Sequence, residues 1–156
     1  MLKIIAAETK EHFDLAKILF KEYASSLEFE LDFQNFEGEI ADIKEAYLEK
    51  RGCVLLAFLQ WDIAGCVALR DIGDEICEMK RLYVKPPFRG MKLGRALAAA
   101  IIERARALGY EAMRLDTIST MQAAIHLYKS LGFREISPYR HNPVEGASYF
   151  ELTLLK

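Results

Sequence analysis

A basic, glycine-containing loop between two apolar segments has residue types and a spacing suited to anion binding. It follows the apolar residues Leu82 to Val84 and two prolines, and it consists of Arg89, Gly90, Met91, Lys92, Leu93, Gly94 and Arg95. The periodic apolar residues after it predict a helix, whose first unpaired N–H groups would converge on one point where a phosphate can bind. Residues 79–102 hold six cations and no acidic residue, in a chain of net charge −2. A phosphate compound is therefore the expected ligand; a solvated basic turn is the alternative.

Several ligand classes are excluded by what the sequence lacks. The spacing of Gly90 and Gly94 is too short for a GxxxxGK[ST] phosphate loop, and no GxGxxG follows the first predicted strand. Near-neutral charge with one local basic patch argues against a nucleic-acid partner. The longest uncharged apolar run, Cys53 to Trp61, is less than half of the roughly 20 residues that a membrane span needs. A small polyanion fits best.

Length and composition are those of an ordinary folded protein. A chain of 156 residues, 52% hydrophobic and 28% charged, is expected to form a single domain, 1–156, without a metal or disulfide. Cys53, Cys66 and Cys77 lie in strand-like runs, which predicts buried thiols in a reducing compartment. With too short an apolar N-terminus for a signal peptide, a cytoplasmic location is expected.

The apolar periodicity predicts a mixed α/β fold. A strand at 3–7 and an N-cap at Thr9 precede one helix, and a second helix carries apolar residues from Phe33 to Tyr47. Short connections then require an antiparallel meander, and a strand–helix–strand unit makes one pair parallel. We expect a six- to seven-stranded mixed sheet with about four helices on both faces. The later strands are predicted at 53–59, 63–70, 75–84, 112–117, 133–136 and 148–154, and the later helices at 94–109 and 121–131.

Two motifs about forty residues apart resemble those of the GNAT superfamily of acyl-coenzyme A dependent N-acetyltransferases. The loop Arg89 to Gly94 stands in place of the family's [QR]xxGx[GA], and Leu127 to Phe133 stands in place of its LYxxxGF. The resemblance covers essentially the whole chain, and residues 142–147 are similar to a bacterial subgroup. The chain departs from the family motifs at two positions. Lys92 replaces the middle glycine, which should be tolerated if the backbone there stays helical, and Met121 stands where many members have asparagine.

The resemblance implies transfer of an acetyl group from acetyl-coenzyme A to a primary amine, by direct attack through a tetrahedral intermediate and without a metal. The cosubstrate would be bound by Leu82, Tyr83, Val84, Arg89, Gly90, Met91, Lys92, Leu93, Gly94 and Arg95. An amine with a pKa of about 10.4 must first lose a proton, an oxyanion must be stabilised, and the leaving thiolate needs a proton.

These three tasks have candidate residues. The family motif assigns proton donation to Tyr128, whose alternative is a core tyrosine on an apolar helix face. Proton removal is assigned to Glu78, for which an ion pair with a nearby cation is the alternative, and Asp116 and His141 are reserve candidates. A backbone N–H of Leu82 or Tyr83 would stabilise the oxyanion.

The acceptor is indicated only by charge. Between Leu27 and Glu49 there are eight acidic residues against one cation, Lys44, and by the resemblance this region borders the acceptor site. An acidic rim there, including Glu28, Glu30 and Asp32, would attract a polyamine, a lysine side chain or an amino sugar. A solvated helix face is the alternative.

Two further readings of the chain stay open at this stage. A non-catalytic acyl-coenzyme A binding or sensor module would keep the same loop, although Tyr128 favours an enzyme. An acyl donor other than acetyl-coenzyme A is compatible with the sequence as well. A homodimer is a family habit that the sequence does not test.

Overall fold

The described strands form one mixed sheet in the computed structural model, which describes residues 1–27, 36–48, 51–118 and 121–154. The strand order is β1-β2-β3-β4-β5-β7-β6, and β4 with β5 is the parallel pair, as the sequence predicted. The other neighbouring pairs are antiparallel. The strands are β1 (Leu2–Ala6), β2 (Cys53–Leu59), β3 (Asp62–Gly73), β4 (Ile76–Val84), β5 (Ala112–Ile118), β6 (Arg134–Ile136) and β7 (Ala147–Thr153).

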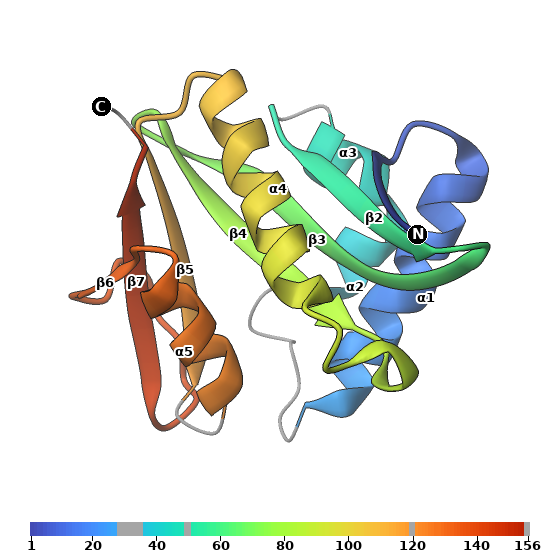
Figure 1. The fold of residues 1–156 in the computed structure, drawn as a ribbon. Helices are drawn as coiled ribbons and strands as arrows, with labels where there is room; N and C mark the ends of the chain where they lie inside the picture. Colours follow the sequence, from blue (N-terminus) through green and yellow to red (C-terminus); the bar gives the residue numbers. More distant parts are fainter. Residues whose placement is uncertain (28–35, 49–50, 119–120, 155–156) are drawn as a thin grey trace.

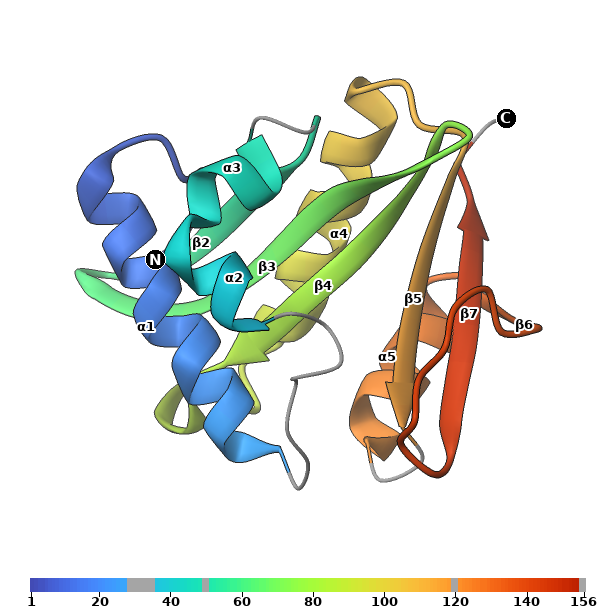
Figure 2. The same ribbon diagram turned by 180° about the vertical axis from the view of Figure 1, so that it is seen from behind.

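Helices cover both faces of this sheet (Figures 1 and 2). On one face lie α4 (Leu93–Ala107) and α5 (Gln122–Ser130), whose apolar residues share a core with alternate residues of the central strands. On the other lie α1 (Lys10–Ser26), α2 (Phe36–Ala41) and α3 (Ile43–Tyr47). In β2, Leu55 and Ala57 pack towards α4, whereas Val54 and Leu56 pack towards α1 and α3. The fully apolar sequence of β2 follows from this burial on both faces.

The predicted second helix is wrong as a single element, because its described part consists of α2 and α3. The side chain of Asp42 accepts a hydrogen bond from the N–H of Glu45 at 3.1 Å and so caps a new helix at Ile43. Phe33, at the start of the predicted helix, lies outside the described residues. The described residues therefore have five α-helices, where about four were expected.

Other local predictions agree closely with the structure. Thr9 caps α1, accepting from the N–H of His12 at 3.1 Å, and β2 has the predicted bounds. The three cysteines are buried and free, and burial raises the pKa of each thiol. Among the described residues, no helix is both long and apolar enough to cross a membrane.

The parallel strands β4 and β5 separate soon after they begin. Only Ile76, Cys77 and Glu78 pair with β5 in the described residues, and beyond them the two strands diverge (Figure 1). A bulge in β4 contributes to this, because Arg81 and Leu82 stand opposite a single residue of β3, and Arg81 has a φ of 60°. The separation leaves room for a cavity in the middle of the sheet.

Candidate active site

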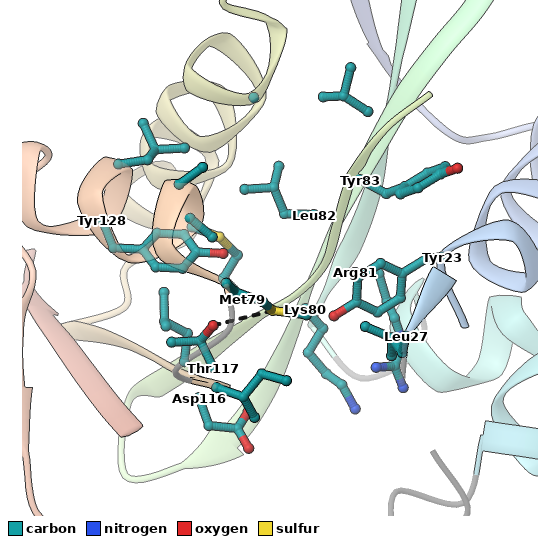
Figure 3. A pocket seen from close by; sticks show the side chains of 18 of the residues that line it. Tyr23, Leu27, Met79, Lys80, Arg81, Leu82, Tyr83, Asp116, Thr117 and Tyr128 are labelled. Atoms are coloured by element: carbon teal, nitrogen blue, oxygen red, sulfur yellow. Dashed lines mark hydrogen bonds between the residues drawn. The ribbon is translucent and has the colours of Figure 1, made fainter. Parts of the chain in front are cut away.

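A cavity of about 500 Å³ lies between the diverging strands. Its walls include the end of β4, the end of β5, the start of α5 and the end of α1. In Figure 3, Tyr128 of α5 lies on one side of it, and Tyr23 and Leu27 lie on the opposite side. The cavity therefore connects the face covered by α4 and α5 with the face covered by α1.

Tyr128 is buried, and its hydroxyl points into the cavity (Figure 3). Within the described part of the chain, no residue accepts a hydrogen bond from this hydroxyl, while the ring packs against Phe133 at 5.8 Å between centroids. Burial raises the pKa of the Tyr128 phenol above its ordinary value, so the group stays protonated at neutral pH. A protonated phenol facing a cavity can donate its proton to a bound molecule.

The predicted cosubstrate residues fall into two groups. Leu82, Tyr83, Val84, Arg89 and Gly94 line the cavity. The others do not line it and instead form the loop and the first turn of α4: Gly90, Met91, Lys92, Leu93 and Arg95.

Two arginines brace this loop. The Nε–H of Arg89 donates to the carbonyl of Val84 at 2.9 Å. At the other end, Arg95 donates to the hydroxyl of Ser130 at 2.6 Å and so joins the start of α4 to the end of α5. The first turn of α4 contains no acidic residue, so its N-terminus keeps the positive potential that suits a phosphate.

Glu78 lies among ion-pair partners, which was the alternative to its predicted role as proton acceptor. Its side chain is fully buried and does not line the cavity. It pairs with Arg70 at 2.9 Å and Arg140 at 3.1 Å and accepts from the Tyr139 hydroxyl at 2.6 Å. Burial raises the pKa of this carboxyl, but Arg140 and Arg70 outweigh burial and hold it below its ordinary value. Such a group has little tendency to accept a proton.

The two reserve candidates differ in position. The carboxylate of Asp116 lines the cavity, pairs with Arg140 at 2.7 Å and accepts from the side-chain amide of Asn142 at 2.8 Å. His141 is exposed and does not line the cavity. Of the three predicted proton acceptors, Asp116 is thus the one at the cavity.

A buried charge cluster at the cavity was missed from the sequence. Arg81 binds Glu39 of α2 through two hydrogen bonds, at 2.7 and 2.9 Å, and the Tyr47 hydroxyl donates to the same carboxylate at 2.6 Å. Lys80 also lines the cavity, with its Nζ 3.9 Å from Glu39. Lys80 and Arg81 are two of the six cations in residues 79–102 from which the sequence predicted an anion site. In the sequence, charged residues inside a buried strand were the available signal, but their partner lies about forty positions away.

Comparison with known proteins agrees with this geometry. Residues 14–133 match the sequence model of the acetyltransferase (GNAT) family. The chain belongs to the GNAT family. It is also 40% identical to an uncharacterized N-acetyltransferase of Schizosaccharomyces pombe over 157 residues, which cover 99% of this chain and 96% of that protein. The protein is accordingly an acyltransferase, as the motifs predicted.

Two further proteins are informative about chemistry and fold. An N-acetylaspartate synthetase of Xenopus tropicalis is 31% identical over 113 residues, covering 71% of this chain but only 42% of that longer protein. A Salmonella typhimurium protein solved with its cofactor acetyl-CoA has the same fold, with a TM-score of 0.78 and 21% identity, covering 99% of this chain and 95% of that one. Structural neighbours in the GNAT family thus bind acetyl-CoA.

Both departures from the GNAT motifs have a visible structural consequence. The condition for tolerating Lys92, a helical backbone, is not met, because Lys92 is the N-cap of α4 with φ 63° and ψ 23°. This is the left-handed region where glycine, the family residue, is favoured. Met121 is the N-cap of α5, and its sulfur accepts a hydrogen bond from the Thr117 hydroxyl at 3.4 Å. Its thioether therefore holds β5 to the start of α5.

Proposed function

We propose that this protein transfers the acetyl group of acetyl-coenzyme A to the primary amine of a small molecule or a protein. The observation that carries the proposal is the Tyr128 hydroxyl, directed into a cavity between two separated strands with the basic loop at one end of one strand. A proton donor, a strand edge and a helix N-terminus are the parts that this transfer needs. Membership of the GNAT acetyltransferase family supports the proposal.

The residues present fit acetyl-coenzyme A. The loop from Arg89 to Arg95 and the N-terminus of α4 would hold its pyrophosphate. The edge of β4 from Met79 to Val84 has no β5 partner in the described residues, and its backbone groups would pair with the amides of the pantetheine arm. The cavity is large enough for a thioester and a small acceptor together. When bound, the thioester supplies an activated acetyl carbon.

Different residues of the chain would transfer the protons and stabilise the oxyanion. A backbone N–H of Leu82 or Tyr83, beside the bulge, would donate to the oxyanion that forms on direct attack by the amine. Tyr128 would give its proton to the departing thiolate. We assign removal of the amine proton to Asp116, because it lines the cavity, whereas Glu78 would position Arg140 beside it.

These observations say less about the acceptor than about the cosubstrate. The acidic-rim hypothesis depends on Glu28, Glu30 and Asp32, which lie outside the described residues. One member of that acidic stretch, Glu39, is buried against Arg81 and is only 8% exposed. The N-acetylaspartate synthetase relative adds amino acids to the candidate acceptors. The buried free cysteines also agree with the cytoplasmic location that we propose.

Replacing Tyr128 by phenylalanine tests the proposal. We expect release of free coenzyme A thiol, measured with an amine panel, to fall in kcat by about a hundredfold, the usual contribution of a positioned acid. Acetyl-coenzyme A affinity should stay unchanged, because the ring and its packing remain. Tyr110→Phe is the matched control: it removes another buried hydroxyl, which donates to the carbonyl of Arg51 away from the cavity. Equal activity of the Tyr128 variant and the wild type would refute the acid role.

The alternative function, a non-catalytic acyl-coenzyme A sensor, has its own signature. Acetyl-coenzyme A at 100 times its dissociation constant would still add about 2.7 kcal/mol to the free energy of unfolding. No amine in the panel would then release thiol. A protein stabilised by acetyl-coenzyme A but inactive towards every amine would favour this alternative over the enzyme.

A further inference from the structure

Lys80 is a buried cation that faces the cavity, and among the described residues its one ion-pair partner, Glu39, is distant. Its side chain is only 6% exposed, and its nearest described carboxylate oxygen, on Glu39, lies 3.9 Å from Nζ, beyond hydrogen-bonding distance. Glu39 is already occupied, since it accepts two hydrogen bonds from Arg81 and one from Tyr47. An ammonium in this setting lacks part of the hydration that it had in water, so an anion beside it would be stabilising.

The described charges around Lys80 do not cancel. Glu39 neutralises Arg81, while Glu78 and Asp116 are matched by two arginines that bind them. The surrounding cations are Arg70, Lys80, Arg81 and Arg140, and the carboxylates are Glu39, Glu78 and Asp116. Four positive charges thus face three negative ones, and the unmatched charge is that of Lys80. A single negative charge on a bound molecule would balance this surplus positive charge.

The position of Lys80 fits the acceptor better than the cosubstrate. It projects from β4 towards the face covered by α1 and α2, as its contact with Glu39 requires, whereas Tyr128 belongs to the face covered by α4 and α5. In Figure 3, Lys80 and Asp116 both extend to the lower end of the view, away from Tyr128. Both line the cavity, so a molecule seated between them would meet the ammonium of Lys80 and the carboxylate of Asp116.

We propose that Lys80 binds a carboxylate carried by the amine acceptor, so that the acceptors are amino acids or other amino carboxylates. The inference rests on the proposed acetyl transfer and names its substrate class. The ammonium of such a zwitterion would be attracted by Asp116 while its carboxylate pairs with Lys80. The carboxylate of the acceptor matches the surplus positive charge at Lys80, whereas a second cation, as in a polyamine, would add to that surplus.

The protonation of Lys80 agrees with this role. Burial, and next the charge of Arg81, lower the pKa of Lys80 to about 7. A bound carboxylate would restore its ordinary preference for the charged form and raise this pKa. Carboxylate binding should therefore take up a proton above neutral pH.

The test compares matched acceptors in matched variants. Each amino acid is paired with its amide and with the amine that lacks the carboxyl group, and putrescine represents the cationic amines. Lys80→Met should raise KM for the amino acids about ten- to a hundredfold, the range for losing a hydrogen bond between charged groups, with kcat changed far less. Lys80→Arg should keep most of the affinity. Lys44→Met, at an exposed lysine of α3, should behave like the wild type.

A binding measurement separates this inference from the proposed function. Calorimetric titration of the amino acids into coenzyme A-saturated protein needs no turnover, and binding should be lost in Lys80→Met. Preference of the wild type for amides or putrescine, or equal amino-acid affinity in wild type and Lys80→Met, would overturn the inference while acetyl transfer stands. Amino acids that bind through Lys80 but are never acetylated would instead overturn the proposed function.

Discussion

At the scale of single residues, Lys80 makes the stability of the protein depend on pH. Burial lowers the pKa of Lys80 to about 7, whereas the unfolded chain keeps an ordinary lysine. Below pH 7 both states hold the proton, and the folded state carries a buried charge. Above pH 7 the folded state has released a proton that the unfolded state still holds, so the free energy of unfolding rises with pH. The charged groups that act on Lys80 from the surrounding elements are Arg81 of its own strand, Glu39 of α2, Arg70 of β3 and Glu78 of β4.

Urea denaturation of Lys80→Met, compared with the wild type, isolates this dependence. The wild type should gain up to about 1.4 kcal/mol per pH unit between about pH 7 and pH 8.5 that the variant lacks. At pH 6 the variant should be at least as stable, since no buried ammonium has to be desolvated. The window ends there because cysteine thiols of the unfolded chain begin to lose protons at about pH 8.5, whereas burial raises the pKa of the folded thiols and keeps them protonated, which lowers the free energy of unfolding. Parallel pH profiles of the two proteins would show that Lys80 stays charged in the fold.

At the scale of elements, the start of α4 carries conformational strain at Lys92. A side chain in the left-handed region costs about 1–2 kcal/mol, and Lys92 has no side-chain capping bond in return. We expect Lys92→Gly to be more stable than Lys92→Ala by about 1 kcal/mol, the reverse of the usual order in a helix. Both variants lose the same charge, so the difference in their urea midpoints reports the backbone alone. An alanine variant as stable as the glycine variant would mean that the loop is not held in this conformation.

The same elements explain which parts of the fold the sequence predicted. Strand β2 and helix α4 have long periodic apolar patterns and clear ends, so their bounds were predicted within a residue or two. The split at Asp42 was missed because a capping aspartate does not interrupt the apolar stripe that continues from Ile40 to Tyr47. The left-handed backbone at Lys92 was not predicted, because it depends on how the loop closes, which the residue type alone does not show.

The site was predictable where its parts are local in sequence. Tyr128 and the loop belong to short motifs, and the structure gives Tyr128 a cavity to face. The partners of Lys80 and Glu78 come from α2, β3 and the loop before β7. Their assembly depends on tertiary packing, so the sequence could offer only an ion pair as one alternative for Glu78 and nothing for Lys80.

At the scale of the whole molecule, the sheet consists of two parts with a narrow connection. Strands β1 to β4 meet strands β5 to β7 directly through three registered pairs in the described residues. Arg140 lies just beyond the last pair and binds Glu78 of β4 and Asp116 of β5 with one side chain. Its own carbonyl accepts from the hydroxyl of Tyr149 in β7 at 2.9 Å. One residue thus ties both parts together where the cavity begins.

Replacing Arg140 by methionine should therefore weaken the protein and its cosubstrate site together. Glu78 would stay buried with Arg70 as its remaining cation, and we expect a loss of about 2–4 kcal/mol in urea denaturation, typical of breaking a buried ion pair. Arg134→Met is the control, because that arginine also binds a carboxylate, on Glu151, but is 67% exposed. This replacement should change the free energy of unfolding by less than about 0.5 kcal/mol. Acetyl-coenzyme A should also bind more weakly to the Arg140 variant, since the two walls of its cavity are no longer fixed relative to each other. Equal urea midpoints for the two variants would show that the three strand pairs alone hold the sheet together.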